Sequence, residues 1–93
     1  MSFSIQHNAA ASRFEVVVDG QLCVLEYRLQ GQVMTITHTG VPTEVGGRGI
    51  AADLATAAFE AARASGWKVL PACSYAAVFV KRHPEYDDLI VSA

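Results

Sequence analysis

The sequence predicts a mixed α/β fold in which an antiparallel sheet is followed by a strand–helix–strand unit. One observation is a series of short β-branched or alternating segments in the first forty residues, separated by turn signals. Another is a long alanine-rich segment, residues 48–65, that lies between two strand-like segments. With 93 residues the chain is long enough for one compact domain and too short for two, so residues 1–93 are interpreted as a single domain.

The first half of the chain predicts an antiparallel meander of three or four strands. Residues 3–7 are expected to form a short strand, and residues 14–18 have the valine content of another. Asp19-Gly20 is a hairpin signal. The next segment alternates as a half-buried strand does, with one face made of Cys23, Leu25, Tyr27 and Leu29. A turn at Gln30-Gly31-Gln32 then leads to a strand at residues 33–39.

The second half predicts two helices around one further strand. Residues 48–65 form the long helix, which ends at Gly66 in a left-handed cap. Its apolar arc is broad and indicates burial against the sheet; the expected stripe is Ile50, Leu54, Ala57 and Ala61, widened by Ala51, Ala55, Ala58 and Ala62. Residues 67–71 are expected to pair in parallel with residues 33–39. A second, shorter helix spans residues 75–83, before Pro84, and the tail packs at an edge or frays.

Composition narrows the class of protein. A net charge of −2 gives no electrostatic attraction to nucleic acid or an acidic membrane, so neither is expected as a partner. No apolar run approaches the ~18 residues of a membrane span, and the N-terminus lacks the features of a signal peptide, so we expect a cytoplasmic protein. The two cysteines, Cys23 and Cys73, are far apart and not clustered with histidines, which predicts free thiols and no metal site.

A glycine-rich loop joins the strand at residues 33–39 to the long helix. Three glycines, Gly46, Gly47 and Gly49, surround Arg48. The first N–H groups of a helix have no internal partners and lie at the positive end of the helix dipole, so such a junction is suited to binding phosphate. Neither a Walker Gly-Lys-Ser/Thr nor the spacing G-x-G-x-x-G is present. A merely flexible connection is the alternative interpretation.

This loop resembles the pyrophosphate loop of the GNAT superfamily of acetyl-CoA-dependent N-acetyltransferases. The superfamily motif runs Arg/Gln-x-x-Gly-x-Gly/Ala, and Gly46-Gly47-Arg48-Gly49-Ile50-Ala51 covers it here. Gly46 replaces the usual Arg or Gln, which removes a long polar side chain from the first position.

Further segments are similar to those of a group of small, single-domain GNAT-like proteins. That group shares an H-T-x-V-P-x-x-x-x-G-x-G-I-G/A loop, a P-x-C segment and an R-H/N-P-x-Y/W ending. In this chain they are the loop that begins at His38, Pro71-Ala72-Cys73 and Arg82-His83-Pro84-Glu85-Tyr86. The resemblance covers residues 14–89 and implies a GNAT-like mixed sheet, with one long helix after the glycine loop and a second short helix.

The resemblance also implies acetyl-CoA or coenzyme A as the cofactor. Backbone groups of Thr39 and Val41 would contact the pantetheine arm, where two strands splay apart. The pyrophosphate would be held by the loop residues Gly46, Gly47, Arg48, Gly49, Ile50 and Ala51. The acceptor would be an amine, and we expect an exposed lysine on a protein or peptide, because the chain has little length left to build an acceptor pocket.

Cys73 and His38 are the candidates for catalysis. The resemblance places Cys73 at the mouth of the splay, and a helix that begins just after it would favour its thiolate. Cys73 either takes the acetyl group or only packs along the channel. His38 is a candidate proton acceptor, with a structural role as the alternative. Where many members of the superfamily carry a tyrosine acid, this chain has Phe79 and Val80.

Three classes of function fit these residues. The first is an N-acetyltransferase that acts on an amine. The second is a non-catalytic module that binds acyl-CoA or CoA, which the absent tyrosine acid and the short chain favour. The third is an interaction domain that keeps the fold without the ligand, and the intact glycine loop argues against it. We predict the first.

Overall fold

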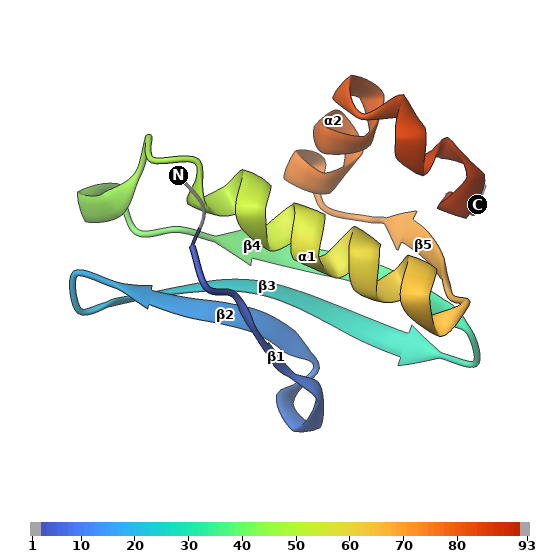
Figure 1. Ribbon diagram of the computed structural model, residues 1–93, viewed down its shortest axis with the longest axis horizontal. Coiled ribbons are helices and arrows are strands. Elements are labelled where there is room, and N and C mark those ends of the chain that lie inside the picture. The colour runs from blue at the N-terminus through green and yellow to red at the C-terminus, as the bar shows by residue number, and fades with distance from the viewer. Residues whose placement is uncertain (1–2, 92–93) are drawn as a thin grey trace.

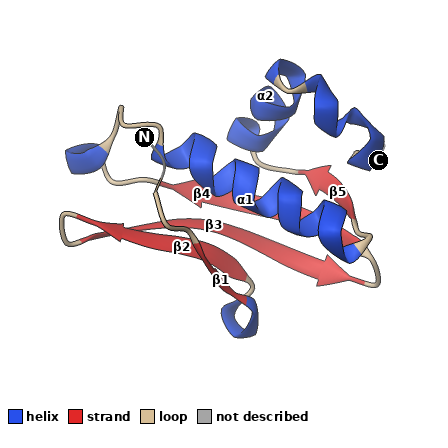
Figure 2. Cartoon of the chain, viewed as in Figure 1, coloured by secondary structure: helices blue, strands red, loops and turns tan. Residues whose placement is uncertain are grey.

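The computed structural model describes residues 3–91 and has a five-stranded sheet in the order β1-β2-β3-β4-β5. Figure 1 shows the two α-helices on the same side of this sheet, and Figure 2 shows the strands beneath them as a continuous layer. The buried side chains form one cluster between the sheet and the helices. The mixed α/β fold predicted from the sequence is therefore confirmed.

The strands follow the predicted order. They are β1 (Gln6–Asn8), β2 (Arg13–Val18), β3 (Gln21–Gln30), β4 (Val33–Gly40) and β5 (Lys68–Pro71). Neighbouring strands from β1 to β4 are antiparallel, and β5 pairs in parallel with β4. The first strand lies later than the predicted residues 3–7, because Phe3 is bound instead to the long helix: its backbone N–H donates to Asp53 Oδ2 at 2.8 Å.

The hairpin between β2 and β3 turns at the two residues predicted for it. Asp19 and Gly20 both have positive φ angles, 51° and 76°, as a turn of the primed type requires. The alternation of β3 is also confirmed: Cys23, Leu25 and Tyr27 are buried, and only Leu29 at its end is exposed.

A β-bulge interrupts the pairing of β3 with β4. Tyr27 lies opposite Ile36 and Glu26 lies opposite His38, so Thr37 is an extra residue in β4. Opposite residues in a sheet share a face, and Leu25 lies opposite Thr39. Ile36 and Thr39 therefore both face the helices, whereas His38 faces the other side of the sheet. A regular strand was expected over this segment, and the bulge was not predicted from its sequence.

The parallel pair is shorter than β4 itself. Only Val33 to Ile36 of β4 pair with β5, whereas β4 continues beside β3 as far as Gly40. The carbonyl of Ile36 accepts hydrogen bonds from the N–H groups of both Ala72 and Cys73, each at 3.0 Å. Beyond this carbonyl, one edge of β4 has no strand partner among the described residues. The two strands thus separate where the resemblance implied a splay.

The long helix, α1 (Ile50–Ser65), ends as predicted at Gly66 in the left-handed conformation, with φ 75°. Its buried residues are Ile50, Leu54, Ala55, Ala58, Phe59 and Ala62. The predicted apolar stripe is therefore wrong at Ala57 and Ala61, which are only partly buried. The large ring of Phe59, which the predicted stripe did not include, is fully buried and sets which side of α1 faces the core.

The C-terminal segment packs on α1 through aromatic rings. It consists of α2 (Ser74–Arg82) and the 3-10 helix η3 (Pro84–Leu89). The ring of Phe59 stacks on Phe79 at 5.6 Å and on Tyr86 at 5.0 Å between centroids. The Tyr86 hydroxyl donates to Glu60 Oε2 at 2.6 Å. The tail then runs parallel to β5, where Ile90 forms an isolated bridge with Val69 and the Val91 N–H donates to Val69 O at 2.9 Å.

The hydrogen bond from Tyr86 to Glu60 predicts a specific loss of stability. Tyr86→Phe is expected to lower the free energy of unfolding by about 1 kcal/mol at neutral pH, because the bond is lost. Burial and the Glu60 carboxylate raise the pKa of Tyr86 to about 12 from its usual value of 10. A raised pKa stabilises the fold below pH 10, and this contribution disappears as the pH rises from 10 to about 12.

Urea denaturation of the wild type and the Tyr86→Phe variant across that pH range measures the effect. The difference in unfolding free energy should shrink as the pH rises, because the wild type alone loses the Tyr86 contribution. Tyr75→Phe is the matched control, since the Tyr75 hydroxyl has no hydrogen-bond partner in residues 3–91. A Tyr75→Phe loss as large as that of Tyr86→Phe would show that the hydroxyl bond is not the cause.

Candidate functional site

The glycine loop between β4 and α1 contains two left-handed residues. Gly47 and Gly49 have φ angles of 78° and 80°, a region that side-chain-bearing residues rarely adopt. Gly49 is the N-cap of α1, whereas Gly46 is extended, with φ −66° and ψ 161°. A Cβ placed at Gly47 or Gly49 would meet no heavy atom within 4 Å. The loop backbone therefore borders open space on the side where a ligand could approach.

The same loop presents a run of backbone donors. The N–H groups of Val45 and Gly46 are bound to Pro42 O and Thr43 O, both at 3.1 Å. The next backbone hydrogen bond, also 3.1 Å, runs from Asp53 N to Gly49 O. Between them, the N–H groups of residues 47–52 have no backbone acceptor in the described chain, and no side chain caps the helix. Such donors at the positive end of a helix are suited to binding an anion.

The Arg48 side chain of this loop contacts another part of the chain. Its Nη1 donates to Asp19 Oδ2 at 2.7 Å, which joins the loop to the turn of the β2–β3 hairpin. This contact was not predicted, because nothing in the sequence near Asp19 indicates which side chain its hairpin turn will contact.

Cys73 lies at the N-terminus of α2, where its sulfur has two polar contacts. The backbone N–H of Ala76 donates to Cys73 Sγ at 3.4 Å, so the side chain caps the helix. The Thr39 hydroxyl lies 3.6 Å from the same sulfur. Thr39 reaches it because the bulge at Thr37 turns this side chain toward the helices. Two potential donors therefore converge on a half-buried thiol.

The other thiol has a different environment. Cys23 is completely buried in the sheet, and burial raises the pKa of its thiol. The prediction that Cys23 belongs to the core is confirmed.

His38 is not grouped with Cys73. It is exposed and lies on the face of β4 opposite the helices, beside Glu26 on β3. A Cβ at Gly40 would lie 2.9 Å from His38 Nε2, so the imidazole extends along its own strand over this glycine. Val41 follows the strand and is half-buried. The structure thus brings Thr39 and Cys73 together, while His38 is separated from them by the thickness of one strand.

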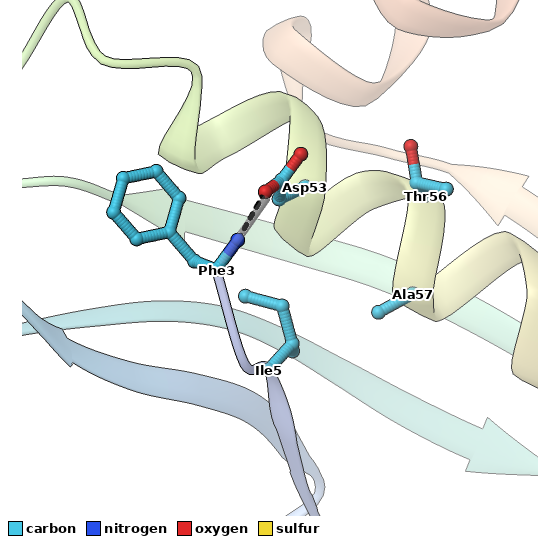
Figure 3. A pocket seen from close by; sticks show the side chains of 5 residues that line it. All are labelled: Phe3, Ile5, Asp53, Thr56 and Ala57. Carbon is cyan, nitrogen blue, oxygen red and sulfur yellow. Dashed lines mark hydrogen bonds between the residues drawn. The ribbon is translucent and has the colours of Figure 1, made fainter. Parts of the chain in front are cut away.

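A shallow hollow of about 250 Å³ lies elsewhere, between the N-terminal residues and the outer side of α1. Figure 3 shows its lining residues, Phe3, Ile5, Asp53, Thr56 and Ala57, with the Asp53 carboxylate bound to the backbone of Phe3. None of the predicted site residues lines it. In residues 3–91, no helix has the length and hydropathy to cross a membrane, and no cluster of His, Cys, Asp or Glu is arranged to hold a metal ion.

The two thiols should differ in reactivity. Iodoacetamide is expected to modify Cys73 in the folded protein and to leave Cys23 unmodified, because only Cys73 is accessible. Thr39→Val removes the hydroxyl beside the sulfur at constant shape and should slow alkylation of Cys73 about threefold at neutral pH, whereas Thr39→Ser should restore the rate. Peptide mass spectrometry over time measures both effects. Equal rates in the wild type, Thr39→Val and Thr39→Ser would show that the hydroxyl does not act on the thiol.

Both the sequence and the fold of this chain are similar to those of GCN5-related proteins. A family model described as GCN5-related N-acetyl-transferase matches residues 13–89, which include the glycine loop, Thr39 and Cys73. The fold is similar to the solution structure of a GCN5-like protein from Staphylococcus aureus, with 28% sequence identity and a TM-score of 0.76. That alignment covers 97% of this chain and 89% of the other.

Proposed function

Since the chain belongs to the GCN5-related N-acetyltransferase family, we propose that it takes the acetyl group of acetyl-CoA and transfers it to an exposed amine on a protein or peptide. The observation that carries this proposal is the loop at the start of α1. Its unpaired backbone donors lie beside left-handed Gly47 and Gly49, with open space in front of both. A diphosphate needs several N–H donors, and hydrogen bonds to a charged acceptor are the strong ones.

The pantetheine arm of acetyl-CoA is proposed to lie along β4. Beyond Ile36 one edge of this strand lacks a strand partner in the described chain, so backbone groups of Thr39 and Val41 are proposed to bind the pantetheine amides. Gly46 to Ala51 would hold the pyrophosphate at the other end of the path. Acetyl-CoA supplies an acetyl thioester, and the path leads that thioester toward Cys73.

Cys73 is proposed as the nucleophile. Its sulfur, which lies beside the Thr39 hydroxyl and the Ala76 N–H, attacks the thioester carbonyl as the thiolate. The bond from Cys73 sulfur to the acetyl carbon forms, the bond to the CoA sulfur breaks, and CoA leaves as a thiolate that takes up a proton. A neutral amine then attacks the acetyl-cysteine and the amide forms. The electron pair returns to Cys73 sulfur, which takes up the proton that the amine nitrogen loses.

The acceptor amine must be neutral to attack, whereas a free lysine has a pKa of about 10.4 and is mostly protonated near neutrality. His38 lies on the face of the sheet opposite Cys73, so it is not placed to take this proton from an amine that attacks the acetyl-cysteine, and the proton is proposed to leave to solvent. None of the proposed site residues lines the hollow described above. A lysine on a large partner therefore suits this site better than a small metabolite that needs an enclosing pocket.

A non-catalytic CoA-binding module is the second candidate function. Phe79 and Val80, which lie where many members of the superfamily carry a tyrosine acid, are buried in the core and have no proton to donate. In this alternative the glycine loop holds CoA, and Cys73 only caps α2.

The loop assignment predicts a loss of CoA affinity from one glycine substitution. Gly49→Ala should weaken CoA binding at least tenfold in calorimetry, because it disfavours the left-handed backbone and fills the space beside the donors. Gly66→Ala is the matched control: Gly66 ends the same helix with φ 75° and equally open surroundings. Both variants should lose similar stability, and only Gly49→Ala should lose affinity. Unchanged CoA affinity in a folded Gly49→Ala protein would exclude this loop as the binding site.

The covalent step predicts an isolable adduct. Incubation with acetyl-CoA should add one acetyl group to the wild type, removable by hydroxylamine, and none to Cys73→Ala, although that variant still binds CoA. Cys73→Ser should also lose most transfer. His38→Gln should form the adduct and pass the acetyl group to lysine peptides at normal rates, because His38 lies on the opposite face of the sheet from Cys73. Intact-protein mass spectrometry follows both steps. An unmodified wild type together with unaltered transfer by Cys73→Ala would rule out the cysteine route.

A further inference from the structure

The ion pair between Arg48 and Asp19 joins the glycine loop to a distant turn. Arg48 Nη1 lies 2.7 Å from Asp19 Oδ2, and the side chains are 45% and 65% exposed. Arg48 is in the middle of the donor run, between the two left-handed glycines. Its backbone N–H therefore belongs to the proposed anion site, whereas its guanidinium is already paired with the carboxylate of Asp19.

Asp19 is held in place by the hairpin. It is the first residue of a two-residue turn, and the strands on either side pair directly up to it, with Val18 opposite Gln21. Both turn residues have positive φ, which fixes the direction of the chain at this point. The Asp19 carboxylate is thus presented to the loop by a regular ladder rather than by a long flexible segment.

We propose that Asp19 competes with the diphosphate of CoA for Arg48 and so determines the affinity of the loop for its ligand. This inference rests on the proposed binding of CoA by the loop. An exposed ion pair is weak and easily exchanged, so a diphosphate, which carries more negative charge than one carboxylate, can displace Asp19 from the guanidinium. The displaced carboxylate remains anchored nearby and repels the bound phosphates.

The opposite role, in which Asp19 orients Arg48 toward the ligand, predicts the opposite result. If Asp19 were a positioning residue, removing its charge would weaken binding. If Asp19 is a competitor, removing its charge strengthens binding, and only while Arg48 is present. The sign of the change and its dependence on Arg48 therefore separate the two roles.

Calorimetric titration with CoA and with inorganic pyrophosphate, at an ionic strength of about 0.1 M, tests this competition. The proteins are the wild type, Asp19→Asn, Arg48→Gln and the double variant. Asn followed by Gly forms the same kind of turn as Asp followed by Gly, so the fold is retained in Asp19→Asn. We expect Asp19→Asn to bind CoA and pyrophosphate about fivefold more tightly than the wild type, Arg48→Gln to bind more weakly, and the double variant to match Arg48→Gln.

Asp88→Asn controls for net charge. Asp88 pairs with Arg63 near the other end of α1, and its side chain is 64% exposed, as Asp19 is 65%. This variant changes the net charge equally and should leave both affinities unchanged, because screening suppresses the effect of a charge so far from the loop. A matching gain in Asp88→Asn would assign the effect to net charge and overturn the competition.

The outcomes separate this inference from the proposed function. Measurable CoA binding by the wild type with an equal or weaker affinity in Asp19→Asn overturns the competition and leaves the CoA site standing. The expected pattern with pyrophosphate, but no binding of CoA, supports the competition and contradicts the proposed function. Absence of binding of either probe to all four proteins contradicts both.

Discussion

The carbonyl of Ile36, which accepts hydrogen bonds from both Ala72 and Cys73, is the point at which β4 and β5 part. One residue further along β4, the extra residue Thr37 reverses the alternation of side chains. These two features together leave one edge of β4 without a strand partner in the described chain and turn Thr39 toward the sulfur of Cys73. A regular strand would have placed Thr39 on the opposite face, and the thiol would have had only its helix for a polar neighbour.

The aromatic part of the core holds α2, and with it Cys73, in position. Phe59, buried in the middle of α1, stacks on rings from both α2 and η3, and the C-terminal segment is held further by Arg63, which donates to Glu85 O at 2.8 Å. The position of α2 fixes that of Cys73, because this residue is the N-cap of α2. The Arg82-to-Tyr86 segment thus has a structural role, since His83 Nδ1 lies 2.8 Å from Phe79 O at the end of α2 and Tyr86 binds Glu60.

Local signals in the sequence predicted the features that depend on a few neighbouring residues. The Asp19-Gly20 turn, the alternation of β3 and the Gly66 cap were all identified, since each depends on φ angles or on side-chain spacing within one element. The glycine loop was located for the same reason. The bulge at Thr37 has no such signal, because no glycine or proline marks it. The contacts of Asp19 with Arg48 and of Thr39 with Cys73 join residues 29 and 34 positions apart, so they depend on the assembled sheet.

The pairing of β4 with β5 also has a consequence for folding kinetics. Strands β1 to β4 join neighbours through short turns, whereas β4 meets β5 only after the chain has passed through all of α1. Closing a long loop costs more entropy than closing a hairpin, so contacts between distant residues form later on average. The meander and the helix can therefore collapse first, and the parallel pair that brings Cys73 to Thr39 completes the fold. A nascent chain would carry the glycine loop before it possessed the paired thiol and hydroxyl.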